Sequence, residues 1–411
     1  MTAASPAPKR APLYRNLDYV FLVAAQGVSI TGREIEGIVL PLLVLALTGS
    51  PAQVGLVAAA QGLPYLILGL PAGALVDRWD ARRVMMACDA VRTLAFASLP
   101  AAWALGVLSM AQLYGVALIT GAAFVFYNIA EISGITRLVG QEDLPRALSV
   151  NGVVEWVGAN GGPVLGGVLT GLGRTTIIGA MMAYAVQAAM LGVSVVLLGG
   201  IRTPIRAERS APKHLAAEIR DGLGWLLRHR LVRGMAGRAM ALNIFFSPVV
   251  LAMIVLARQS FHAAPAAIGV MFSAAGLGGL AATIAAPWLR PRIPVGWIMT
   301  GAVVIWGFAM MAMAAAPNLI VLGLTWAVMP AISGIADVTT VSYRLSLIPA
   351  EMQGRVNSVF RLLAWGLNPV SLAVGGVLVA SLGARPTLWI LAAGVAATAV
   401  VTLFGPLRSA R

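Results

Sequence analysis

The chain alternates long apolar segments with short polar ones. The apolar segments are about 20 residues long, the length at which an α-helix crosses the hydrocarbon core of a bilayer. Turn-forming residues separate them, as at Thr48–Pro51 and Gly383–Pro386. The pattern predicts an all-α membrane protein of about twelve transmembrane helices, centred near residues 32, 64, 95, 122, 159, 187, 246, 277, 304, 331, 368 and 395.

One long polar segment, residues 200–233, divides the apolar segments into two sets of six. Its second half places Leu215, Ile219 and Leu223 at helical spacing among arginines, which predicts an amphipathic helix lying on the membrane surface. We expect an N-terminal six-helix bundle (1–199), a cytoplasmic linker with this helix (200–233) and a C-terminal six-helix bundle (234–411). A connecting role for the linker is simpler than a regulatory one.

The two halves share a sequence repeat. Residues 138–169 align without gaps with residues 347–378, so that Arg146 falls on Arg355 and Trp156 on Trp365. Parallel repeats of this kind predict two pseudo-symmetric bundles with a substrate site between them near the bilayer midplane.

Composition agrees with a membrane environment. Hydrophobic residues make up 59% of the 411 residues and charged residues only 11%, whereas a soluble domain carries about 25% charged residues. The net charge of +14 does not indicate a nucleic-acid partner, because the arginines lie between apolar segments. One set of loops holds most of them, Arg137 and Arg344 included. The positive-inside rule therefore predicts both termini in the cytoplasm.

The sequence lacks signatures of several other classes. Cys88 is the single cysteine, the three histidines have no metal-ligand spacing, and no phosphate-binding loop is present. No small-residue cleavage site follows the polar N-terminal stretch, so the first apolar segment is expected to be retained. We therefore expect a multi-pass protein of the inner membrane without metal or other cofactor, and not an enzyme.

A charged loop separates the second and third apolar segments. Gly73, Leu75, Asp77, Arg78 and Arg82 resemble the G-x-L-x-D-R-x-G-R-R signature of the major facilitator superfamily. The form D-R-W-D-x-R-R is similar to the variant in its macrolide, tetracycline and enterobactin exporters, with Asp80 and Ala81 departing from the general pattern. An ordinary positively charged loop is the alternative interpretation.

The resemblance implies a gating role for this loop. Asp77 would face the start of the eleventh helix near Arg355 when the inner side is closed, with Arg137 or Arg92 balancing it. Gly73 would let two helices approach closely. The residues assigned to gating are Gly73, Asp77, Arg78, Arg82, Asp89, Arg92, Arg137 and Arg355.

The fifth apolar segment holds a second motif. Its glycines recur at four-residue spacing, which makes one smooth helix face, and its proline removes a backbone hydrogen bond. The spacing resembles the antiporter motif of drug-exporting facilitators, and generic helix packing is the alternative. The residues are Ser149, Gly158, Gly162, Pro163, Gly166 and Gly167.

Several charged residues lie inside apolar segments, where each costs about 3 kcal/mol. Arg33 and Glu36 are three apart and can pair, with Glu34 pointing elsewhere. Asp89 and Arg92 form a similar pair, and Glu131 is expected to reach water at the end of its helix. A proton-coupled transporter needs a carboxylate that binds and releases a proton. The candidates are Glu34, Glu36, Glu155 and Asp337, with purely structural ion pairing as the alternative.

Aromatic and amide side chains are the candidates for lining a substrate cavity, although any single one packs in the core more often than it binds a ligand. The candidates, with one arginine, are Arg33, Tyr127, Asn128, Trp156, Asn243, Trp326, Trp365 and Asn368.

These observations favour a secondary active transporter that exports a small amphipathic compound, a drug or secondary metabolite, by proton antiport. Export of a siderophore or a lysolipid is the alternative transport reaction, and a non-transporting scaffold or sensor is the alternative of another class. The expected partners are the substrate, protons and membrane lipids, with the chain acting as a monomer. Substrate identity does not follow from the sequence.

Overall fold

The computed structural model describes residues 15–76, 78–139, 142–205, 215–289, 292–405 and 407. The regular elements in these ranges are helices. The first six are α1 (Leu17–Thr48), α2 (Pro51–Val76), α3 (Ala81–Ala104), α4 (Met110–Leu138), α5 (Leu144–Leu172) and α6 (Thr176–Gly199). The others are α7 (Leu215–Arg228), α8 (Arg230–Phe246), α9 (Val249–Val255), the π-helix η2 (Leu256–Ser260), α10 (Pro265–Leu289), α11 (Val295–Ala314), α12 (Leu319–Leu347), the 3₁₀ helix η3 (Ala350–Met352), α13 (Gln353–Trp365), α14 (Asn368–Leu382) and α15 (Ala384–Phe404).

The predicted all-helical membrane fold is confirmed. Ten helical segments of the described ranges are long and apolar enough to cross a membrane, with α8 through η2 forming one segment and α13 with α14 another. α1 falls outside this group because Arg33, Glu34 and Glu36 lie in its middle, and α5 because its many glycines, Glu155 and Asn160 lower its mean hydropathy. The total of twelve spans, which includes these two, stays a prediction.

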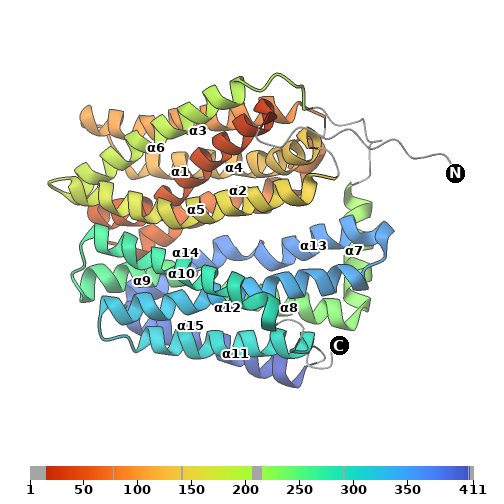
Figure 1. Ribbon diagram of the computed structural model, residues 1–411. Helices are drawn as coiled ribbons and strands as arrows, with labels where there is room; N and C mark the ends of the chain where they lie inside the picture. The colour runs from red at the N-terminus through yellow and green to blue at the C-terminus, as the bar shows by residue number, and fades with distance from the viewer. Residues whose placement is uncertain are drawn as a thin grey trace.

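The helices form two stacked groups, α1–α6 and α8–α15 (Figure 1). We call the side on which α1 begins and α15 ends the termini side, and the opposite side the far side. Many of the helices begin at a polar side chain that accepts a backbone N–H. Examples are Asn16 before α1, Asp80 before α3 and Asn318 before α12.

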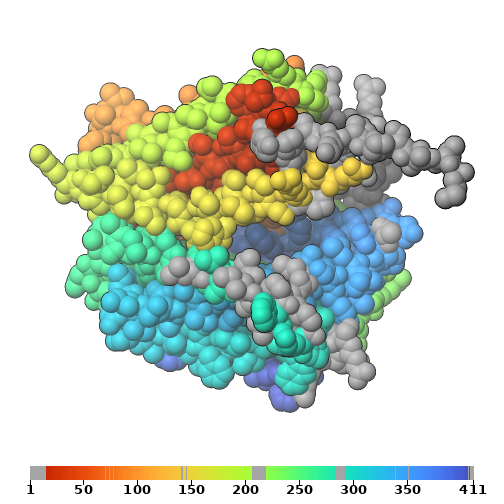
Figure 2. All heavy atoms as spheres, in the orientation of Figure 1, coloured from red at the N-terminus to blue at the C-terminus, as the bar shows by residue number. Residues whose placement is uncertain are grey.

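Among the described residues, the hydrophobic cores join the two groups on the far side. One cluster of buried residues there includes both halves, for example Val44 and Leu113 with Met253 and Leu388. On the termini side each half has a core of its own, around Leu22 in one and Val356 in the other. Figure 2 shows the surface hollowed between α5 (yellow) and α13 (blue). The two halves are therefore sealed together at one end and separate at the other.

The far-side seal depends on glycines at which the halves touch. A Cβ on Gly167 of α5 would lie 2.6 Å from the Pro265 oxygen and 2.9 Å from the Gly269 Cα of α10. A Cβ on Gly55 of α2 would lie 2.7 Å from the Gly376 Cα of α14. Distances as short as these leave no room for a methyl group, so backbone meets backbone at both seams.

The amphipathic helix of the linker is present as α7, but its apolar face does not lie free. Ile219, Leu223 and the buried Leu226 pack into the termini-side core of the second half, beside Val359. Gly222 permits close approach, because its Cβ would lie 2.7 Å from the Arg355 oxygen. The expectation of a helix resting on the membrane surface is therefore replaced by a helix docked on α13.

Candidate functional site

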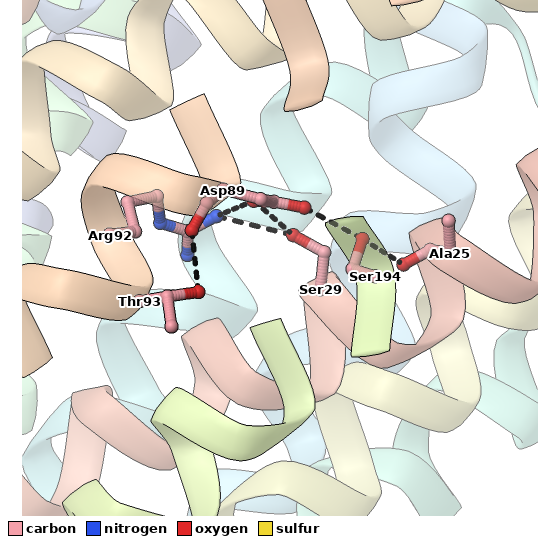
Figure 3. Close-up of polar contacts among 6 residues, drawn as sticks. All are labelled: Ala25, Ser29, Asp89, Arg92, Thr93 and Ser194. Carbon is pink, nitrogen blue, oxygen red and sulfur yellow. Dashed lines mark hydrogen bonds and ion pairs between the residues drawn. The ribbon is translucent and has the colours of Figure 1, made fainter. Parts of the chain in front are cut away.

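A buried ionic network ties α3 to α1 and α6. The Arg92 guanidinium lies 3.1 Å from the Asp89 carboxylate, and both side chains are buried. Ser29 of α1 donates to Asp89 Oδ1 (3.2 Å), and Ser194 of α6 donates to Oδ2 (2.7 Å). Figure 3 shows these groups converging between the three helices. The pair anticipated from sequence therefore exists, and every oxygen of its carboxylate is hydrogen-bonded.

The charges in the middle of α1 are arranged differently from the prediction. Arg33 pairs with Glu34, at 2.9 Å, and its guanidinium lies 5.1 Å from the centre of the Phe124 ring of α4. Glu36 is buried at 4% exposure and is hydrogen-bonded by Gln61 of α2. The predicted pairing of Arg33 with Glu36 is wrong, because packing turns Glu36 toward α2 while Arg33 and Glu34 share a half-exposed side.

Glu131 of α4 is a buried acid outside the set of predicted proton carriers. It is only 6% exposed, and its Oε1 has no hydrogen-bond partner in the described part of the chain. Its electrostatic neighbours come from three helices: Arg33 of α1, Asp89 and Arg92 of α3, and Glu155 of α5. Glu155 itself is exposed and accepts from Asn151 (3.3 Å). Glu131 does not reach water as expected, because α4 continues beyond it to Leu138.

The glycine motif of α5 contacts two helices. A Cβ on Gly158 would lie 2.6 Å from the Ile30 Cγ2 of α1, and one on Gly166 would lie 3.0 Å from the Ile35 oxygen. Gly162 meets Glu34 of α1 still more closely. Gly167, on the next face, makes the seam with α10, where the Pro163 oxygen also approaches Gly269. The motif thus packs α5 against α1 and joins the two halves.

The loop after α2 is described in part. Asp77 lies outside the described residues. Gly73 is not a site of close helix packing, since a Cβ there would meet open space among the residues described. Arg78 is exposed, and Arg82 donates to the Leu198 (2.9 Å) and Gly199 (2.6 Å) carbonyls at the end of α6.

Two further arginines of the gating set lie near the termini side. Arg137 is in the last turn of α4. Arg355 of α13 donates to Asp221 of α7 (3.4 Å) across a partly exposed contact.

A cavity of about 660 Å³ lies in the second half, between α8, α11, α12 and α13. It contains three of the predicted cavity residues, Asn243, Trp326 and Trp365, together with the proton-coupling candidate Asp337. Arg238 and Arg344, which were not predicted as cavity residues, also line it. Arg344 was expected in a loop; instead it lies in the last turn of α12 and is buried at 9% exposure.

The other predicted cavity residues lie elsewhere. Asn128 lines a smaller cavity with Tyr65 and Arg361, where Arg361 donates to the Tyr65 hydroxyl (2.9 Å). Tyr127 is buried in the core of the first half, and the half-exposed Trp156 lies on α5 beside Gly279 of α10. Asn368 begins α14, with a buried Oδ1. Arg33 is the α1 residue that pairs with Glu34 and lies near Phe124, as described above.

Comparisons with known proteins agree with this architecture. The Multidrug efflux pump Tap of Mycobacterium tuberculosis (strain ATCC 25618 / H37Rv) is 29% identical over 409 residues, covering 96% of this chain and 93% of the pump. The Enterobactin exporter EntS of Citrobacter koseri (strain ATCC BAA-895 / CDC 4225-83 / SGSC4696) is 24% identical over 375 residues, covering 90% and 85%.

Solved structures share the fold at low identity. The nucleoside transporter NupG matches with a TM-score of 0.73 at 13% identity, over 94% of this chain and 98% of that one. A bacterial homologue of the iron transporter ferroportin in an inward-facing state matches with a TM-score of 0.73 at 17% identity, over 97% and 100%. These relatives and neighbours are transporters and not enzymes. A family model described as transmembrane secretion effector matches residues 7–411, so the chain belongs to that family, within the major facilitator superfamily.

Proposed function

We propose that this protein exports a small amphipathic compound, a drug or a siderophore, in exchange for protons. The observation that carries the proton component is the group of acids in the first half. Beyond the Arg33–Glu34 and Arg92–Asp89 pairs, Glu36 and Glu131 are buried and form no ion pair of their own in the described part of the chain, although Arg92 and Arg33 lie close enough to act on both electrostatically. A carboxylate held away from water is costly to keep ionised and neutralises by taking up a proton. The two efflux relatives support export as the direction of transport.

We place the termini side in the cytoplasm, because the arginine-rich loops lie there. The described form then corresponds to an inward-open state, with the far-side seams closed. The bundles 1–199 and 234–411 would rock about the central chamber, with 200–233 as the connecting linker. The gating set, with Asp77 and Arg355 at its centre, would close the cytoplasmic side in the opposite state.

Enlarging Gly167 tests this movement. Gly167→Val should disfavour the inward-open state, because the added side chain would collide with Pro265 and Gly269. Spin labels at Thr136 and Ser346, one in each half near the termini side, should report shorter distances than in the wild-type protein. Asp77→Asn, if gating is as proposed, should shift the same distances the other way.

The matched control is Gly161→Val on the same helix, where a Cβ meets nothing within 4 Å. An unchanged distance distribution in folded Gly167→Val would contradict the rocking movement about this seam.

Export itself is tested in cells that overexpress the chain. We expect reduced susceptibility to a subset of amphipathic compounds, and a protonophore should abolish the difference between expressing and empty cells. Purified protein in vesicles should then move the same compounds under an imposed pH gradient. Resistance that persists in the presence of the protonophore would contradict proton coupling. An absence of flux for every compound in the vesicles would contradict export.

A further inference from the structure

The cavity of the second half carries an excess of positive charge. Three arginines, Arg238, Arg344 and Arg361, line it with one carboxylate, Asp337. Arginine inside a membrane protein is costly unless a counter-charge, a carbonyl or water accompanies it. The acids of the first half show the opposite balance, since Glu36 and Glu131 are buried there beside Arg92. The positive excess is therefore a feature of the second-half cavity.

Of these three arginines, Arg344 is the one without a hydrogen bond or ion pair in the described part of the chain. It is only 9% exposed, and its Nε has no hydrogen-bond acceptor in the described part of the chain. Its guanidinium lies 3.8 Å from the centre of the Phe360 ring, which fixes its plane without neutralising it. An uncompensated buried cation strongly favours any anion that reaches it.

Arg238 is partly committed to the protein. It donates to the Met299 carbonyl (3.2 Å) and to the Thr340 hydroxyl (3.3 Å), while its Nε has no partner among the residues described. Asp337 is close enough to interact with it electrostatically. These contacts hold the Arg238 guanidinium in place on the cavity wall.

The rest of the cavity is aromatic. Phe246 stacks on Trp306 (5.1 Å between ring centres) and on Trp326 (5.8 Å). The indole Nε1 groups of both tryptophans have no hydrogen-bond partner in the described chain. Such a wall accepts a flat aromatic body by stacking.

The geometry points to this cavity as a site for an amphipathic anion. The carboxylate or sulfonate of the ligand accepts hydrogen bonds from Arg344 and Arg238, and its aromatic body lies against Phe246, Trp306 and Trp326. This inference rests on the proposed export function and narrows its substrate class, since the positive excess disfavours lipophilic cations. Arg361 adds positive charge to the cavity, and Asp337 offsets part of it.

Three probes with one aromatic body test the charge preference: 1-naphthoate, 1-naphthylmethylammonium and neutral 1-naphthalenemethanol. Their binding to the purified full chain in lipid nanodiscs is measured by calorimetry at neutral pH. We expect 1-naphthoate to bind more tightly than the other two. Arg344→Gln should weaken 1-naphthoate binding by about tenfold or more, the scale of a charge-assisted hydrogen bond, and should leave the neutral alcohol unaffected.

Two controls separate this result from misfolding and from loss of net charge. Asp337→Asn should tighten 1-naphthoate binding, a gain that a damaged fold does not produce. Arg174→Gln removes an exposed arginine outside the cavity and should change nothing.

The outcomes also separate this inference from the export proposal. Equal binding of the three probes, or binding indifferent to both Arg344→Gln and Asp337→Asn, would overturn the anion site and leave export untouched. The opposite result combines two measurements. If 1-naphthoate binds tightly and both variants change its affinity as expected, but reconstituted vesicles show no proton-driven flux, the anion site is supported and proton-coupled export is overturned.

Discussion

Glu131→Gln is expected to abolish export driven by a pH gradient while leaving substrate binding intact. Glutamine keeps the shape of the side chain but cannot carry a proton. Among the buried acids, Glu131 is the better carrier than Glu36, because its Oε1 has no hydrogen bond in the described chain whereas Gln61 holds Glu36. Four charged groups surround it: Arg33, Asp89, Arg92 and Glu155. A change in the charge of Glu131 would therefore alter its electrostatic interactions with α1, α3 and α5.

The measurement is flux into or out of reconstituted vesicles with and without an imposed pH difference. Glu131→Gln should transport at the same slow rate in both conditions, and Glu36→Gln, Glu34→Gln, Glu155→Gln and Asp337→Asn should each keep more of the gradient-driven flux. Glu351→Gln, at an exposed position of η3, is the matched control. Gradient-driven flux at the wild-type rate in Glu131→Gln would assign the proton to another carboxylate.

Asp89→Asn is expected to cause the largest loss of stability. The substitution leaves the buried Arg92 without its counter-charge, and breaking such a pair costs about 3–5 kcal/mol. Ser29 and Ser194 donate to different oxygens of Asp89, and an asparagine keeps only one of these acceptors and no negative charge. Thermal unfolding in detergent should therefore show a clearly lower midpoint.

Two comparisons make this result specific. The double variant Asp89→Asn with Arg92→Gln should be less destabilised than the single one, because the uncompensated cation is gone. Asp221→Asn breaks a partly exposed pair with Arg355, and exposed pairs contribute about 0–1 kcal/mol. Equal losses in the buried and the exposed variant would show that Asp89 is not held as the distances indicate.

The spacing of apolar segments was enough to predict the helical membrane fold, and the glycine spacing of α5 correctly indicated a close helix face. Sequence could not say that Gly158 and Gly162 meet α1 while Gly167 meets α10, because those partners are chosen by the rotation of each helix in the bundle. The same rotation decides that Arg33 pairs with Glu34 and leaves Glu36 to Gln61.

The errors at Glu131 and Arg344 have one cause. Both lie near the ends of 29-residue helices, α4 and α12, which are longer than a simple membrane span of about 20 residues. A span of about 20 residues therefore places charges near the end of such a segment in water or in a loop. In the longer helices both side chains are buried. That Arg344 lines a cavity follows from the packing of the surrounding helices and not from its position in the sequence.

The core shared on the far side also bears on the transporter at rest. Moving to the opposite state would separate Val44 and Leu113 from Met253 and Leu388 and wet those surfaces, at about 25 cal/mol for each Å² of apolar area exposed. In the mechanism proposed above, this cost favours a closed far side in an empty molecule. If export is coupled to protons as proposed, idle copies closed in this way neither dissipate the proton gradient nor readmit the exported compound.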